Sequence, residues 1–344
     1  MSNFQISLAV AGVVVLALMV ARAAWISRQS QPRQAAPAPD RTPGLDGLGI
    51  EPELNAAAFD VASFPVPLPE TRPVMDALID VIAPLALEAP ISGDAALAAL
   101  PSTRRAGSKP FSIEGFNETT QAWETPLAGE RYTVLQAGVQ LANRAGALNE
   151  IEYSEFVMKT QAFCELVGGT PDFPEMLEEV ARARELDQFA SEHDAQLSLV
   201  LRASHAAWSP GYVQQNASRL GFVAGAIPGR LVLPTAAPGL PPALGLSFDT
   251  QAALADDPAQ SAIREVVISL DVPQVARSEQ AFVRMREAAL SLAQSMDGEV
   301  TDDSGLPLSA QTMDEIEAKL EHLYDTLEQR DLAAGSALAR RLFS

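Results

Sequence analysis

The residue types that most often carry catalysis or bind metals are scarce in this chain. Its three histidines, His193, His205 and His322, show no shared ligand spacing, and its only cysteine, Cys164, lies in an apolar helical run. The sequence contains no Walker A loop, G-x-S-x-G elbow, H-E-x-x-H or C-x-x-C motif. We therefore predict a protein that is not an enzyme, without catalytic residues, a metal site or a cofactor.

Two pairs of neighbouring aspartates are the remaining candidates for carboxylate chemistry. Asp256-Asp257 precedes a proline, and Asp302-Asp303 precedes Ser304-Gly305. Both contexts are typical of turns or helix starts, in which the aspartate side chain accepts hydrogen bonds from the backbone. We interpret both pairs as structural.

The charge balance excludes one class of partner. Among 344 residues, 24 Lys and Arg face 44 Asp and Glu, which gives a formal net charge of −20. Nucleic acid binding depends on basic patches that displace counterions, so we do not expect a nucleic acid partner. A single cysteine cannot form an internal disulfide and is compatible with a reducing compartment.

The N-terminus carries the strongest signal in the sequence, a predicted transmembrane anchor over 4–26. This apolar stretch runs from Phe4 to Ile26 and is long enough to cross a bilayer. Trp25 suits the membrane interface, and Arg22 can extend its charged end toward water. Arg22 and Arg28 lie at its C-terminal end and Met1 to Gln5 hold no Lys or Arg, so the positive-inside rule predicts an N-out, C-in orientation. A cleavable signal peptide and an inverted anchor are the alternatives.

A linker rich in proline and alanine is expected over 27–110. Residues 29–110 hold 13 of the 25 prolines, and such a composition favours a disordered, extended tether. Apolar residues interrupt it with spacings that predict a short amphipathic helix over 74–87, ending near Pro84. This helix would dock on the globular part or bind a partner.

The rest of the chain is predicted to be globular, with an additional α/β segment over 111–194 and a domain over 195–340. The additional segment is expected to contain a hairpin, a strand over 132–141, a helix over 151–167 that stops at Gly168-Gly169, and a helix over 173–190. After residue 195, the patterns predict the order strand, helix, strand, strand, strand, helix, strand, helix. The fold class is therefore α+β, with a mostly antiparallel sheet of split β-α-β type and helices packed on one face.

The two globular segments share a local pattern that indicates a partial internal repeat. The order of a strand, a long helix, a glycine and an acidic helix occurs over 132–190 and again over 266–329. The second occurrence lies within the expected C-terminal domain.

This order of parts resembles the ZipA family of bitopic cell division proteins. The resemblance rests on the N-terminal anchor with its Trp25-Ile26-Ser27-Arg28 exit, the tether, and the span 195–330. Within that span, Arg219-Leu220-Gly221-Phe222, Asp271-Val272-Pro273 and Gly298 through Asp302-Asp303 to Leu308-Ser309 look like turns of the family domain. The segment 111–194 has no counterpart in the minimal family domain, so the chain looks like an enlarged variant.

The resemblance implies a function in septation. A family member would lie in the cell inner membrane at the division site, bind the C-terminal peptide of FtsZ and tether the Z ring to the lipid bilayer, with other divisome proteins as further partners. The peptide would lie on the open face of the sheet. The strand residues that alternate away from the core there are Val200, Arg202, Arg230, Val232, Ser247, Val267, Ser269 and Asp271.

Two other functions are compatible with the sequence. The first is a membrane-anchored enzyme of unknown type, which would need a deep pocket lined by acidic or histidine side chains. The second is a periplasm-facing divisome protein that contacts peptidoglycan, which would need the opposite charge bias around the anchor.

Overall fold

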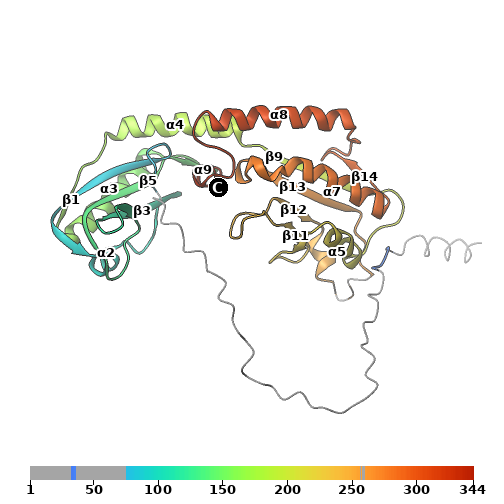
Figure 1. Cartoon of the computed structure of the whole chain (residues 1–344), viewed down its shortest axis with the longest axis horizontal. Coiled ribbons are helices and arrows are strands. Elements are labelled where there is room, and N and C mark those ends of the chain that lie inside the picture. The colour runs from blue at the N-terminus through green and yellow to red at the C-terminus, as the bar shows by residue number, and fades with distance from the viewer. Residues whose placement is uncertain (1–31, 36–74, 256, 258–259) are drawn as a thin grey trace, which may run out of the picture. The chain divides into compact units, whose positions relative to one another are not determined.

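The computed structural model describes residues 32–35, 75–255, 257 and 260–344 of the chain. These residues form two compact units (Figure 1). The N-terminal unit comprises residues 75–193 with Arg341–Ser344, and the C-terminal unit comprises Asp194–Arg340 with residues 32–35. Among the helices in the described ranges, none is both long and apolar enough to cross a membrane. The anchor expected over 4–26 lies outside the described residues.

The N-terminal unit is built on an antiparallel sheet with the strand order β2-β3-β5-β1-β8, and β4 pairs with β3. The elements follow the chain as β1 (Asp80–Ser92), α2 (Gly93–Ala99), β2 (Arg105–Ala106), β3 (Lys109–Asn117), β4 (Ala122–Glu124), β5 (Arg131–Gln140), β6 (Ala142–Asn143), β7 (Gly146–Ala147), α3 (Glu150–Val167), β8 (Gly169–Pro171) and α4 (Met176–His193).

The helix predicted over 74–87 is wrong, because most of this segment is strand β1. Val81, Ala83 and Leu85 are buried and alternate with more exposed neighbours, which is the period of a strand rather than of a helix. β1 pairs with β5 on one side and with β8 on the other. The expected linker over 27–110 is therefore also wrong over 80–110, and its part over 36–74 lies outside the described residues.

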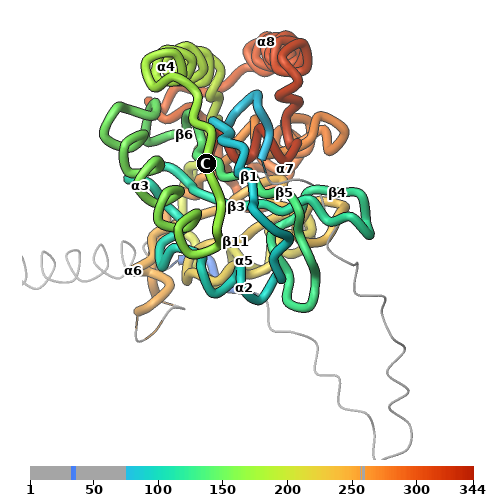
Figure 2. The backbone as a smooth tube through the Cα atoms, turned by 90° about the vertical axis from the view of Figure 1, so that its left-hand side faces the viewer, coloured from blue at the N-terminus to red at the C-terminus, as the bar shows by residue number. Residues whose placement is uncertain are grey.

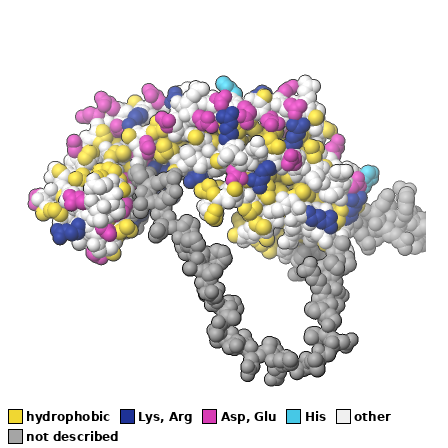
Figure 3. Space-filling model, in the orientation of Figure 1, with side chains coloured by type: hydrophobic (Ala, Val, Ile, Leu, Met, Phe, Trp, Pro, Cys, Tyr) yellow, Lys and Arg dark blue, Asp and Glu magenta, His cyan; other side chains and the backbone are white. Residues whose placement is uncertain are grey.

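The helices of the N-terminal unit follow the expected signals. Asn149 caps α3 in a capping box with Glu152, and Gly168 ends the helix in the left-handed conformation with φ 67°. The hairpin expected after residue 111 is formed by β3 and β4. Acidic side chains are frequent on the exposed sides of α4 and of α8 (Ala310–Glu328) in the C-terminal unit (Figure 3).

The C-terminal unit contains a second antiparallel sheet, with the order β10-β11-β12-β13-β9-β14. Its elements are β9 (Gln196–Ala203), α5 (Pro210–Arg219), β10 (Val223–Ala224), β11 (Arg230–Leu233), β12 (Leu244–Ser247), α6 (Thr250–Ala253), β13 (Glu265–Asp271), the 3-10 turns η2 (Val272–Gln274) and η3 (Arg277–Glu279), α7 (Ala281–Met296), β14 (Gly298–Thr301), α8 (Ala310–Glu328) and α9 (Ala337–Leu342).

One face of this sheet forms the core of the unit. Leu199, Leu201, Ile268, Leu246 and Leu231 are buried, and α7 packs on β9, β13 and β14. The helix α8 packs on α7. The predicted α+β class is confirmed by this arrangement. The predicted order after residue 195 is correct for the main elements, but it lacked the short helices α6 and α9 and contained one strand where the structure has β10 and β11.

The two units share one topology. β1, β3, β5, α3, β8 and α4 of the N-terminal unit match β9, β12, β13, α7, β14 and α8 of the C-terminal unit in chain order and in strand neighbours. In both units the long helix ends at a left-handed residue, Gly168 or Asp297, and the next residue is a glycine that opens the strand beside the first strand. The local pattern in the sequence therefore corresponds to four strands and two helices that are arranged alike in both units.

The end of the chain is fixed to the first strand of the N-terminal unit. Both carboxylate oxygens of Asp80 accept hydrogen bonds from the Arg341 guanidinium, at 2.5 and 2.9 Å, and Asp80 is 2% exposed. The amide of Arg144 donates to the Ser344 carbonyl, and the C-terminus lies beside β6 (Figure 2). The last four residues are therefore part of the packing of this unit.

We predict that Arg341→Ala destabilises the N-terminal unit by about 3 kcal/mol, because the change leaves the buried Asp80 carboxylate without its charged partner. Hydrogen exchange with mass spectrometry should show faster exchange in β1 and β5 and unchanged exchange in β9 and β13. Arg184→Ala is the matched control, since Arg184 forms a surface ion pair with Glu150 that contributes little. Equal exchange in both variants would contradict the prediction.

We also predict that Cys164 is unreactive in the folded chain. It is 2% exposed in α3, and burial raises the pKa of its thiol to about 11. Its thiolate population near neutral pH should be about 300-fold below that of an ordinary cysteine. Ellman's reagent should therefore label the native chain slowly and the urea-unfolded chain at once. Rapid labelling of the native chain would show that this thiol is accessible.

Candidate functional site

The second face of the C-terminal sheet is not covered by α7, and the site residues predicted from the sequence lie on it. Strand register brings Val267 opposite Val200 on one side and opposite Ser247 on the other. Ser247 in turn pairs with Arg230, and Val232 pairs with Gly245. Since directly paired residues project from the same side of a sheet, these side chains share one surface.

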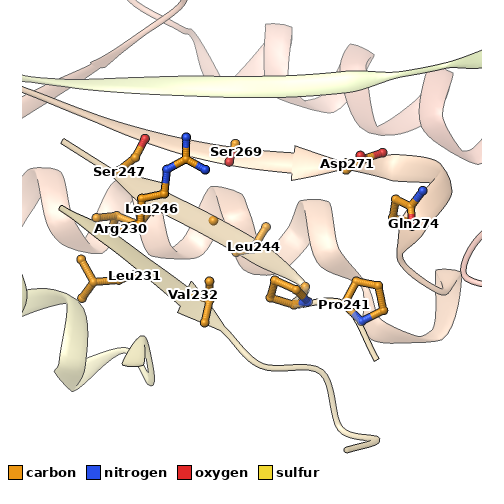
Figure 4. Close-up of a pocket in the computed structure, with 13 residues that line it drawn as sticks. Arg230, Leu231, Val232, Pro241, Leu244, Leu246, Ser247, Ser269, Asp271 and Gln274 are labelled. Carbon is orange, nitrogen blue, oxygen red and sulfur yellow. The ribbon is translucent and has the colours of Figure 1, made fainter. Parts of the chain in front are cut away.

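This surface is hollowed over β11, β12 and β13 (Figure 4). The hollow has a volume of about 390 Å³ and is open to solvent. Arg230 and Ser247 lie at one end, and Asp271, Gln274 and Pro241 lie at the other. Val232 and Ser269 line it between these ends. Its shape is that of a shallow trough rather than a deep pocket, and its ends carry opposite charges.

One predicted residue is less accessible than expected. Val200 is 6% exposed and lies between Val267 and Thr301 of the neighbouring strands. Arg202 remains accessible, with a side chain that is 39% exposed and lies 3.1 Å from a carboxylate oxygen of Glu265. It also lies close to the turn that follows β14, since a Cβ atom added to Gly305 would lie 2.3 Å from Arg202 Nη1. Both residues lie on β9, outside the hollow over β11, β12 and β13.

The structure adds residues that the alternation of the strands did not reveal. Pro241 and Pro242 belong to the loop before β12, and Gln274 belongs to the turn after β13; all three line the hollow. Gly245 forms its floor, and a Cβ there would lie 2.7 Å from Ser269 Oγ. Only the glycine could have been found from the sequence, as the partner of Ser247 in the alternation of β12.

The matching face of the N-terminal unit has a different surface. Val134 is 44% exposed on β5, and its partner Ala86 on β1 is also exposed. Farther along the same face, the Glu114 carboxylate accepts hydrogen bonds from the Met75 amide and from Gln136, both at 2.9 Å. Met75 is buried and contacts the face at Gly138. This face is thus occupied in part by the chain itself.

Histidine and acidic side chains do not gather into a reactive site in the described residues. His193 Nδ1 lies 2.7 Å from the Phe189 carbonyl, and His205 Nδ1 lies 3.2 Å from an Asp297 carboxylate oxygen. The Asp302 carboxylate accepts a hydrogen bond from the Leu306 amide, as expected for a turn. The described part of the chain holds no group of three His, Cys, Asp or Glu side chains placed to bind a metal ion.

Part of the C-terminal unit matches a known protein family. Residues 254–319 match the family described as ZipA, C-terminal FtsZ-binding domain. A comparison with curated proteins found no significant match to the chain. The matched residues include β13, α7 and β14, so they contain one of the three strands that line the hollow and the helix that packs on this strand, whereas β11 and β12 precede the match. The resemblance to the ZipA family is therefore confirmed for residues 254–319, which are similar to part of the family's C-terminal domain.

Proposed function

We propose that this chain is a single-pass inner-membrane protein that binds the C-terminal tail of FtsZ on the open face of its C-terminal unit and so tethers the Z ring during septation. The observation that supports this proposal most strongly is the family match over 254–319, which includes β13, the strand that forms one side of the hollow.

The geometry of the hollow suits a short extended peptide. Val232 and the two prolines offer apolar contacts, while Arg230 and Asp271 offer charged contacts at opposite ends. Val267 lies on the same face beside the hollow, opposite Ser247. An extended peptide presents alternate side chains to a surface, so apolar side chains every second residue would enter the trough. A shallow open trough buries little area, and we expect the single-site affinity to be weak.

Attachment to the membrane would make such a weak site effective. The proposed anchor over 4–26, with Phe4 and Trp25 near its ends and Arg22 and Arg28 on the cytoplasmic side, would hold many copies on one surface. A polymer of FtsZ presents many tails, so the second binding event profits from a high effective concentration. Because acidic surfaces are repelled by anionic lipids, this chain needs an apolar anchor rather than charge to reach the bilayer.

We predict that Val232→Asp weakens binding of an FtsZ-tail peptide at least tenfold, because it places a carboxylate among the residues that line the proposed contact. Val267→Asp should also weaken binding, because Val267 lies on the same face beside the trough, opposite Ser247. The measurement is a titration of the purified full chain in detergent with a fluorescent peptide that copies the FtsZ tail of the same organism.

Val134→Asp is the matched control for both variants. It makes the same change at an exposed strand residue on the equivalent face of the N-terminal unit. Binding that is retained in this control and lost in the other two would support the proposed face. Binding that survives Val267→Asp and Val232→Asp would contradict the face, and no binding at millimolar peptide would contradict the proposed partner.

A further inference from the structure

A short segment, residues 32–35, that lies five residues after the proposed anchor is bound to the C-terminal unit. The Arg33 amide donates to the Ala207 carbonyl at 2.7 Å, and the Ser209 amide donates to the Arg33 carbonyl at 2.9 Å. These two bonds form a parallel bridge between Arg33 and Trp208. Pro32 beside it is buried, and Ala35 contacts Gly211 of α5. Figure 1 shows this segment, in blue, beside α5.

The side chain of Arg33 strengthens this attachment at the end of α7. Its guanidinium donates to the Met296 carbonyl at 3.1 Å and to an Asp297 carboxylate oxygen at 2.7 Å. The indole of Trp208, which is 0% exposed, donates to the same Met296 carbonyl at 2.8 Å. Arg33 thus satisfies carbonyl and carboxylate groups at the helix end, where a positive charge is favourable.

The position of this segment limits the distance between the C-terminal unit and the membrane. Five residues, 27–31, separate the end of the proposed anchor from Pro32. Fully extended, they span at most about 18 Å. We propose that the end of the C-terminal unit at Arg33 and Asp297 is a membrane-facing surface whose partner is the lipid headgroup layer. This inference rests on the anchor in the proposed function.

Because residues 32–35 are docked, the proline-rich segment is not a spacer between the membrane and the binding domain. Since residues 32–35 are bound to the C-terminal unit, residues 36–74 connect this unit to the N-terminal unit instead. Along β13, the docked end lies near Glu265 and the far end of the trough lies at Asp271. Six residues of strand span about 20 Å, so the trough would run away from the bilayer within a short distance of it.

A disulfide tests the docking. The Ala35 Cβ lies 3.7 Å from the Cβ position of Gly211, which is within the range for a disulfide. In the full chain with Cys164→Ala, the pair Ala35→Cys and Gly211→Cys should oxidise at least tenfold faster than the control pair Ala35→Cys and Ser198→Cys. Asp297→Asn, which removes the ion pair with Arg33, should slow the first reaction. Equal rates for the two pairs would overturn the docking.

Energy transfer to labelled lipids tests the orientation. A donor on Arg264→Cys, near the docked end, should transfer more strongly to headgroup acceptors in vesicles than a donor on Gln196→Cys, which pairs with Asp271 at the far end. Equal transfer, with the disulfide formed, would overturn the membrane-facing surface.

Different experimental results would contradict the proposed function and the membrane-facing surface. Deletion of residues 4–26 should abolish energy transfer while the disulfide still forms. If the full chain does not associate with vesicles, the anchor fails, and with it the membrane-facing surface, whatever the disulfide shows. If the peptide does not bind but both tests succeed, the proposed partner fails and this inference stands.

Discussion

In the C-terminal unit, β13 lies between β12 and β9, and its seven residues alternate between two environments. Val266, Ile268 and Leu270 are buried in the core, whereas Val267, Ser269 and Asp271 point to the opposite face. A shift of the register by one residue would exchange the two sets and bury polar groups under α7. The pairing of β13 therefore determines both the core and the accessible trough, and every part of the proposed site depends on it.

The two units share a topology but differ in the side chains on the open faces of their sheets. Both units place the first strand between the third main strand and the short strand after the long helix. The C-terminal unit has an open trough on this face, whereas in the N-terminal unit the Met75 amide donates to the Glu114 carboxylate and Met75 occupies part of the corresponding face. The N-terminal unit also holds the end of the chain through Asp80 and Arg341. One sheet can thus serve different roles when the side chains on its open face change.

Much of the C-terminal unit could be predicted from the sequence, since its strands alternate clearly and its helices carry Ser209 and Gly221 as boundary signals. The start of the N-terminal unit could not. The apolar residues between Val74 and Leu85 satisfy helical and strand spacings alike, and only pairing with β5 and β8 selects the strand. The open face was predicted from the sequence, but the trough on it was not, because Pro241 and Gln274 line the trough from loops. The contacts of Arg33 join residues more than 170 positions apart and leave no local signal.

A methyl NMR titration of the full chain with the FtsZ-tail peptide tests the central claim most directly. If the peptide binds in the trough, the methyl resonances of Val232 and Val267 should shift with one saturable binding curve, while those of Val134 should not move. Shifts confined to Val134 and its neighbours on the N-terminal sheet, or no shifts at saturating peptide, would contradict the claim.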